Sequence, residues 1–196
     1  EVIAYVRSNT LLLRLFAIAF FGIAAFASLE AVFGLWSEQN FAWSARQLGL
    51  VFLAMGATGV VVQTLLIGPL VARFGEPRVI ALGIAILVVA ILLQPLLMSP
   101  VAAVVLMALV MAGHSLAFPN AGALVSRRTP RDRQGAVMGL NMAANATGRI
   151  VAPPLFGWVY SVSANAPFYL CAAMMLAMLF VCLTIIRDLD REIAHD

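Results

Sequence analysis

Six long runs of apolar residues, separated by short connections, occupy most of this 196-residue chain. Each run is long enough, at 1.5 Å of helix rise per residue, to cross about 30 Å of hydrocarbon. Hydrophobic residues make up 63% of the sequence and charged residues 11%, too little polar surface to cover a water-soluble globule of this size. The sequence therefore predicts an all-α membrane protein, a single bundle over residues 1–196. The predicted spans are 11–36, 48–72, 79–98, 101–125, 136–160 and 166–186.

Arginines are concentrated at one end of the predicted spans. All 12 basic residues are arginine; Arg149 lies inside a span, and Arg46 lies in a connection at the opposite end. The other ten precede or begin the first span, or follow the second, fourth and sixth: Arg7, Arg14, Arg73, Arg78, Arg127, Arg128, Arg131, Arg133, Arg187 and Arg191. Because cytoplasmic loops carry the excess of positive residues, we expect this end, with both termini, to be cytoplasmic.

Polar residues within the spans follow the same order in two sets of three. The first two spans of each set carry them and the third carries almost none: Glu30, Gln63 and Thr64 in the first set, and His114, Ser115, Asn141, Asn145 and Arg149 in the second. Because three is an odd number, the second set must lie upside down relative to the first. We therefore predict two inverted three-helix repeats, an arrangement found in transporters. The third and sixth spans, apolar all round, are predicted to be outer, lipid-facing helices.

The loop between the second and third spans has the sequence Gly68-Pro-Leu-Val-Ala-Arg73-Phe-Gly75-Glu-Pro-Arg78. Its glycines allow close approach and left-handed turns, and its prolines restrict the link, which predicts a tight turn that moves with its helices. Two roles are open for Arg73 and Arg78. They serve only to orient the chain in the membrane, or they contact lipid phosphate, helix carbonyls or an acidic residue in one of two conformations.

This loop resembles the signature that joins paired helices in the major facilitator superfamily, with Ala72 in the place of the usual acidic residue. A second segment is similar to helix eleven of drug-proton antiporters in that superfamily, the branch of tetracycline and multidrug exporters. It reads Arg133-Gln-Gly135-Ala-Val-Met-Gly139 and continues to Gly148-Arg-Ile-Val-Ala-Pro153-Pro154-Leu-Phe-Gly157-Trp-Val-Tyr160. The chain thus resembles the C-terminal half, helices seven to twelve, of such a transporter, half of a twelve-helix fold.

The resemblance implies an alternating-access transporter that exports small lipophilic molecules in exchange for protons, in a bacterial inner membrane. Its expected partners are the lipid bilayer, a small-molecule substrate, protons, and a second six-helix half in the same polypeptide or another chain. The alternative is a transporter-like module that acts as a scaffold or partner-binding subunit without transport. No motif for an enzyme, a cofactor, a metal or nucleic acid is found, and none is expected.

Three ionisable residues lie within the predicted spans, and such residues are costly in hydrocarbon. Glu30, among apolar helical neighbours, is the first candidate for a proton carrier; the competing interpretation is a static ion pair with Arg149. His114 follows two methionines on one helix face and precedes Phe118, so it is either a substrate or proton contact or a hydrogen-bonded interhelical histidine. Gln63 completes the candidate cavity residues, together with the amides described next.

The fifth span carries two stripes with a four-residue repeat. Small residues form one, at Gly135, Gly139, Ala143 and Thr147, and polar residues form the other, at Asn141, Asn145 and Arg149. We predict that the small stripe packs against a neighbouring helix. The resemblance implies that the polar stripe borders a central cavity. Prolines predict kinks in the fourth span at Pro119 and in the fifth at Pro153 and Pro154, at opposite ends of the bundle.

Overall fold

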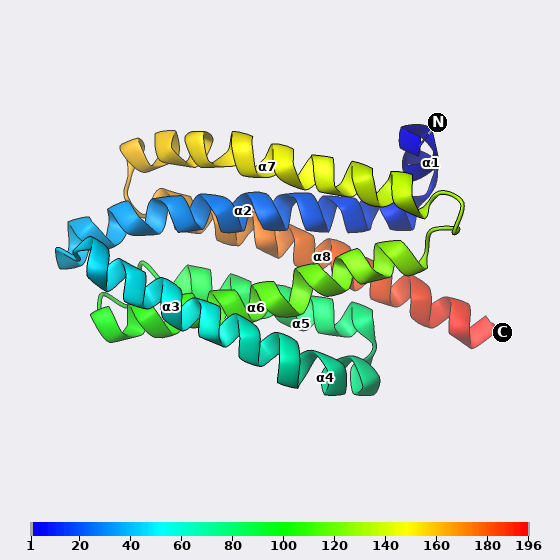
Figure 1. The fold of residues 1–196 in the computed structure, drawn as a ribbon, viewed down its shortest axis with the longest axis horizontal. Helices are drawn as coiled ribbons and strands as arrows, with labels where there is room; N and C mark the ends of the chain where they lie inside the picture. Colours follow the sequence, from blue (N-terminus) through cyan, green and yellow to red (C-terminus); the bar gives the residue numbers. More distant parts are fainter. Residues whose placement is uncertain (1, 196) are drawn as a thin grey trace.

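The computed structural model describes the backbone of residues 2–195 and the side chains of residues 2–191. This part of the chain folds into a layered bundle of nearly parallel and antiparallel helices (Figure 1). The helices are α1 (Val2–Ser8), α2 (Thr10–Phe41), α3 (Ala45–Val61), a π-helical turn (Val62–Leu66), α4 (Ile67–Phe74), α5 (Glu76–Leu93), α6 (Pro100–Arg127), α7 (Gln134–Val162) and α8 (Ala166–His195).

Five of the six predicted spans coincide with helices that are long and apolar enough to cross a membrane. They are Thr10–Phe41, Ala45–Phe74, Glu76–Leu93, Pro100–Arg127 and Ala166–Arg191. The remaining predicted span, 136–160, lies in α7, a 29-residue helix alongside α2. Two asparagines and an arginine in the middle of α7 lower its hydropathy below that of the other helices. That α7 crosses the membrane stays a prediction.

The division between the third and fourth spans is confirmed. Helix α5 ends at Leu93, and α6 begins at Pro100 after a short turn. Proline suits the first turn of a helix because the N–H it lacks would have no helical partner there. Pro77 occupies the corresponding place in α5, after Gly75, whose φ of +80° is in the region that glycine tolerates best.

The ten arginines predicted to share one end do so. The connections α4–α5 and α6–α7, α1 and the C-terminal part of α8 all lie at the same end of the bundle (Figure 1). Three ion pairs join the helices there: Arg14 with Asp188 at 2.6 Å, Arg78 with Asp190 at 2.9 Å, and Arg127 with Glu76 at 3.2 Å. The arginine-rich end is therefore a network that links α2, α5, α6 and α8.

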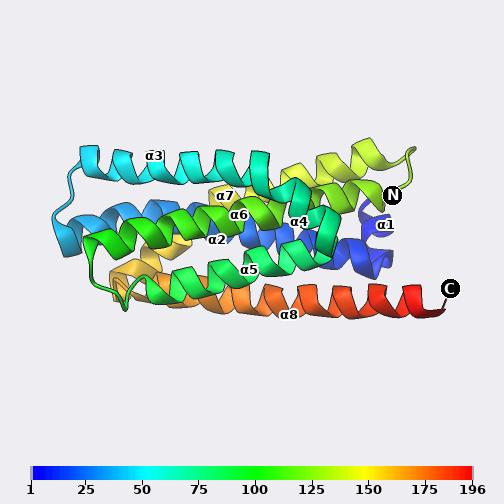
Figure 2. The ribbon, with the colours of Figure 1, turned by 90° about the horizontal axis from the view of Figure 1, so that it is seen from below.

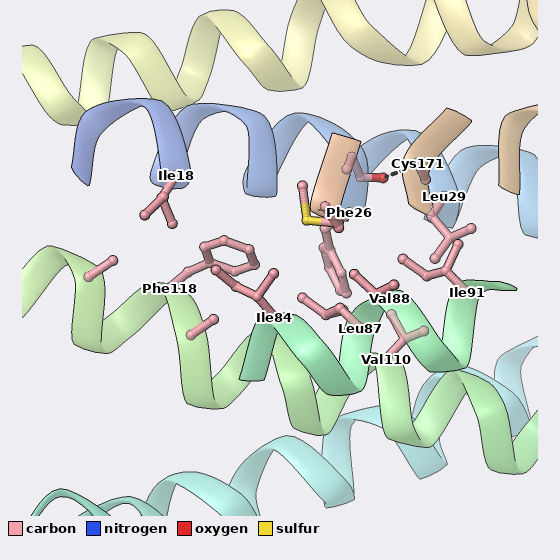
Figure 3. Packing of buried hydrophobic residues seen from close by; sticks show 14 of the residues in the cluster. Ile18, Phe26, Leu29, Ile84, Leu87, Val88, Ile91, Val110, Phe118 and Cys171 are labelled. Carbon is pink, nitrogen blue, oxygen red and sulfur yellow. Dashed lines mark hydrogen bonds between the residues drawn. The ribbon is translucent and has the colours of Figure 1, made fainter. Parts of the chain in front are cut away.

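The core lies between α2, α5, α6 and α8 (Figure 3), where Phe26 and Phe118 point toward each other's helices. Helices α5 and α6 approach closely because two glycines face each other: a Cβ on Gly83 would lie 2.6 Å from the carbonyl oxygen of Gly113. Half of the residues in the 18-residue helix α5 are buried, as large a share as in the most apolar stretch of α2. Helix α5 thus buries the face that carries Ile84, Leu87 and Ile91, and exposes Leu82, Val89 and Leu92 on the other. That its exposed face meets lipid stays a prediction.

Helix α3 occupies one edge of the bundle and α8 the opposite edge (Figure 2). In the most apolar 18-residue stretch of Ala45–Phe74, only 22% of the residues are buried, compared with 28% in α8 and 50% in α2. The segment is also irregular, because the π-helical turn Val62–Leu66 precedes α4. Pro69 lies in the first turn of α4 and removes the N–H that would bond the carbonyl of Leu65, which loosens the helical ladder at this point.

Candidate functional site

Glu30 borders an open hollow of about 570 Å³ between α2, α3 and α6. The walls are apolar apart from this carboxylate: Phe26, Ala31, Phe52, Met55, Gly56 and Met111 complete the lining. The Glu30 side chain is half-buried, and its oxygens make no hydrogen bond or ion pair with any side chain in residues 2–191. A carboxylate among aromatic and thioether side chains can hold a proton or a cationic group, but not both at once.

His114 lies behind the wall of this hollow. Its ring stacks on Phe26, with centroids 4.0 Å apart and planes inclined by 29°, and Phe118 packs on it at 4.8 Å. The buried Nδ1 atom has no hydrogen-bond partner in the part of the chain that is described. The alternative interpretation, a histidine that forms a hydrogen bond between helices, is therefore not seen at Nδ1 in this structure. Phe26 separates the imidazole from the hollow.

Arg149 projects from the exposed side of α7. No Glu30–Arg149 ion pair is formed among the described side chains, whose ion pairs cluster in the arginine-rich end and its loop. The predicted static pair is therefore absent from this conformation. The structure brings Glu30 of α2 and His114 of α6 to opposite sides of Phe26, which lines the hollow and stacks on the imidazole.

The small-residue stripe of α7 does not lie on its packed face within the described chain. The small residues Gly135, Gly139, Ala143 and Thr147 are exposed, and a Cβ on either glycine would meet no atom within 4 Å. The packed face instead carries Asn141, Gly148 and Phe156 and lies against α2, where a Cβ on Gly148 would be 3.3 Å from that of Ala24. Within the described chain the close approach is made by Gly148. That the stripe at Gly135 and Gly139 packs against a neighbouring helix stays a prediction.

Asn141 and Asn145 therefore point toward the bundle rather than away from the packed face. Asn141 is 5% exposed, and the Oδ1 atoms of both amides are buried without a partner in residues 2–191. Arg149, one turn further along, is exposed. The polar stripe is therefore split: the amides of Asn141 and Asn145 face the bundle, whereas the guanidinium group of Arg149 is exposed. Gln63, in the π-helical turn, is exposed and does not line the Glu30 hollow.

The loop signature forms the turn between α4 and α5. Gly75 has the left-handed φ that the turn requires, whereas a Cβ on Gly68 would meet nothing within 4 Å, so close approach is not the reason for that glycine. Arg78 pairs with Asp190 of α8, which is one of the acidic contacts that the sequence left open. Arg73 lies over the ring of Phe74, 5.3 Å from its centroid. Pro119, Pro153 and Pro154 lie inside α6 and α7, and both helices continue through them.

Sequence reasoning missed Glu76. This carboxylate is buried at the start of α5 and pairs with Arg127 at the end of α6. It lies four positions after Ala72, where the acidic residue of the signature is missing. The signal was available in the sequence, because Glu76 and Arg78 flank Pro77 directly after a turn glycine. Its burial and its partner follow only from the packing of α5 on α6.

A model of a known protein family matches residues 15–195, almost the full length of the chain, and its description is Major Facilitator Superfamily. The chain belongs to the Major Facilitator Superfamily. Superfamily members are transporters, and the proteins similar to this chain in sequence include resistance proteins. It is 29% identical over 161 residues to the tetracycline resistance protein, class C, of Escherichia coli. It is 26% identical over 156 residues to multidrug resistance protein 2 of Bacillus subtilis.

These matches cover most of this chain but a minority of each relative. The first spans 82% of the chain and 40% of the tetracycline resistance protein, and the second 80% and 38% respectively. Among solved structures, the human organic anion transporter MFSD10 matches with a TM-score of 0.80 and 24% identity, over 88% of this chain and 40% of that one. This similarity confirms the fold of the superfamily. The chain spans about two fifths of the length of the relatives it matches.

Proposed function

We propose that this chain is the C-terminal half, helices seven to twelve, of an alternating-access transporter that exports small lipophilic molecules in exchange for protons. The observation that carries the proposal is the carboxylate of Glu30 in an open hollow with aromatic and methionine walls. An ionisable group inside a membrane-spanning helix is costly and therefore marks a functional position. The relatives, which are tetracycline and multidrug resistance proteins, support export as the direction.

Helix neighbours support the inverted repeat. In two inverted repeats, α2, α3 and α5 of the first correspond to α6, α7 and α8 of the second. A contact in the bundle should then have a counterpart: α2–α7 corresponds to α6–α3, and α5–α6 corresponds to α8–α2. Each of these pairs is in contact, and the pairs α2–α6 and α5–α8 map onto themselves. A rocking motion of one repeat against the other around the Glu30 hollow would give alternating access.

A second six-helix half is the proposed partner of the exposed faces of α3 and α7. Large apolar side chains such as Leu53, Val60, Ile150 and Trp158 are exposed there, beside the small residues at Gly135 and Gly139. Small residues allow close packing between membrane helices, and this face has no partner within the described chain. The arginine-rich end is assigned to the cytoplasm and both termini with it, in a bacterial inner membrane.

Proton-driven efflux of ethidium from proteoliposomes tests the function, with the complete protein that contains this chain. We expect Glu30→Gln to abolish the response of efflux to an imposed pH gradient, because the amide cannot carry a proton. Glu38→Gln is the matched control, since Glu38 lies on the same helix and is exposed at its end. Unchanged coupling in Glu30→Gln would show that Glu30 is not the proton carrier.

A further inference from the structure

Ser115 is the exception among the buried hydroxyl groups of residues 2–191. Ser28, Ser37 and Thr129 are also buried, and each donates a hydrogen bond to a backbone carbonyl three or four residues earlier, at 2.7 to 3.0 Å. Such back-bonding is the usual way to satisfy a hydroxyl inside a helix. The Oγ atom of Ser115 is 0% exposed, yet it has no partner in the part of the chain that the structure describes. A buried hydroxyl in this state needs an explanation, and a water or a bound molecule can supply one.

The unpartnered hydroxyl points toward α3, at the end of the Glu30 hollow. It lies 3.5 Å from the place where a Cβ of Gly59 would be. Gly59 is one helical turn beyond Gly56, and Ser115 is one turn beyond Met111; both Gly56 and Met111 line the hollow. Gly59 and Ser115 therefore lie one helical turn beyond the hollow, between α3 and α6.

Met111 separates the hydroxyl from the hollow. Its side chain lines the hollow, and its terminal methyl group lies against Gly59, 2.7 Å from the place of a Cβ, beside Ser115. Methionine is unbranched and changes rotamer readily, so its end group can be displaced without moving the backbone. Any larger residue at position 59 would collide with this methyl group. Gly59 thus leaves room for Met111 to act as a movable cover.

We propose that Ser115 is a specificity-determining residue of the Glu30 hollow, whose hydroxyl hydrogen-bonds a polar group of the transported molecule when Met111 moves aside. This role rests on the transport function proposed above. Phe26 and His114 lie at the same level, so Glu30 and Ser115 are separated by about five residues of helix rise, roughly 7 Å along the bundle. The site then favours lipophilic cations that carry an N–H or oxygen at about that distance from the charge.

Two probes separate this role from general binding, in the complete protein in proteoliposomes. Ethidium is a lipophilic cation with two aromatic amines, and tetraphenylphosphonium is a lipophilic cation without a hydrogen-bonding group. We expect Ser115→Ala to weaken ethidium binding about tenfold, the effect of one lost hydrogen bond to a buried partner, and to leave tetraphenylphosphonium binding unchanged. Ser28→Ala removes an equally buried hydroxyl that is bonded within its own helix, and it should change the binding of neither cation.

Thiol labelling gives a second readout that does not depend on affinity. The thiol introduced by Ser115→Cys should react with a small maleimide above the wild-type background, faster when Met111→Ala is added and slower when ethidium is bound. Ser28→Cys is the matched control and should stay unreactive. A thiol at position 115 that is unreactive both with Met111 present and in the Met111→Ala variant would overturn the proposal.

The outcomes distinguish this inference from the function on which it rests. Equal effects of Ser115→Ala on the binding of both cations, or no effect on either, would mean that Ser115 makes no hydrogen bond to the transported molecule. With export intact, the inference alone would then fail. Failure of the wild-type protein to export either cation would overturn both. A selective loss of ethidium binding, with ethidium protection of the thiol at position 115, would establish the role.

Discussion

The imidazole of His114 stacks on the ring of Phe26, and Phe26 in turn forms a wall of the hollow that holds Glu30. One aromatic ring therefore stands between two ionisable groups that come from α2 and α6. This arrangement makes Phe26 the residue whose removal should connect the histidine to the hollow.

Phe26→Ala should expose His114 to reagents that enter the hollow. We expect faster modification of His114 by diethyl pyrocarbonate and a loss of about 3 kcal/mol in stability, because a largely buried phenyl ring is removed from the core. Phe26→Leu keeps most of the volume and is the control. Mass spectrometry of the modified peptide measures the first effect, and a slow, unchanged reaction in Phe26→Ala would show that another group shields the imidazole.

The Glu76–Arg127 pair should contribute measurably to the stability of the arginine-rich end. Glu76 is buried, whereas the Arg127 side chain is 71% exposed, so solvent screening limits the coupling to about 1 kcal/mol. A double-mutant cycle with Glu76→Gln and Arg127→Gln, followed by thermal unfolding in detergent, measures it. The exposed pair Arg133–Asp132 serves as the comparison and should give a coupling near zero.

Gly113→Ala should destabilise the fold through overpacking. The new methyl group would lie 2.6 Å from the carbonyl oxygen of Gly83 and 3.1 Å from the backbone nitrogen of Leu87, so α5 and α6 would have to separate. We expect a loss of about 2 kcal/mol, visible as a lower unfolding temperature. Gly122→Ala is matched, because it lies on the same helix and its methyl group would meet nothing within 4 Å. Equal effects of the two substitutions would contradict this view of the contact.

Asn165→Ala should weaken the end of the bundle opposite the arginines. The indole N–H of Trp36 donates to Oδ1 of Asn165 at 3.0 Å, and the Trp36 side chain is fully buried among aromatic rings. Loss of the acceptor leaves a buried donor without a partner, which costs about 1 to 3 kcal/mol. Gln39→Ala removes the exposed bond to Tyr160 and should cost less. Chemical unfolding followed by tryptophan fluorescence compares the two variants.

Several features could be predicted from the sequence because they depend on local composition. A run such as 79–98 partitions into lipid whatever its neighbours are, and the arginines select one end of each span. The turn at Gly75 and the helix starts at Pro77 and Pro100 also follow from single residues. Glu30 was identifiable for the same reason, since a carboxylate in an apolar run is conspicuous.

The faces of the helices were not predictable in the same way. In lipid, apolar residues are acceptable on both the packed and the exposed side, so hydropathy does not indicate which side is which. The sequence accordingly singled out Gly135 and Gly139, which pack on no helix of the described chain. Gly148 and Gly83 make the close approaches instead, and this depends on the shape of the partner helix.

By itself, the sequence determined the superfamily, the helical spans, the arginine-rich end and the isolated charges within the spans. Only the tertiary structure decided that α5 buries the face with Ile84, Leu87 and Ile91 and that Glu76 pairs with Arg127. It also decided that Phe26 stacks on His114 and that Ser115 alone among the buried hydroxyls of residues 2–191 lacks a partner. The physical reason is that partition into lipid is a property of each segment, whereas contacts between segments depend on side-chain shape across helices far apart in the chain.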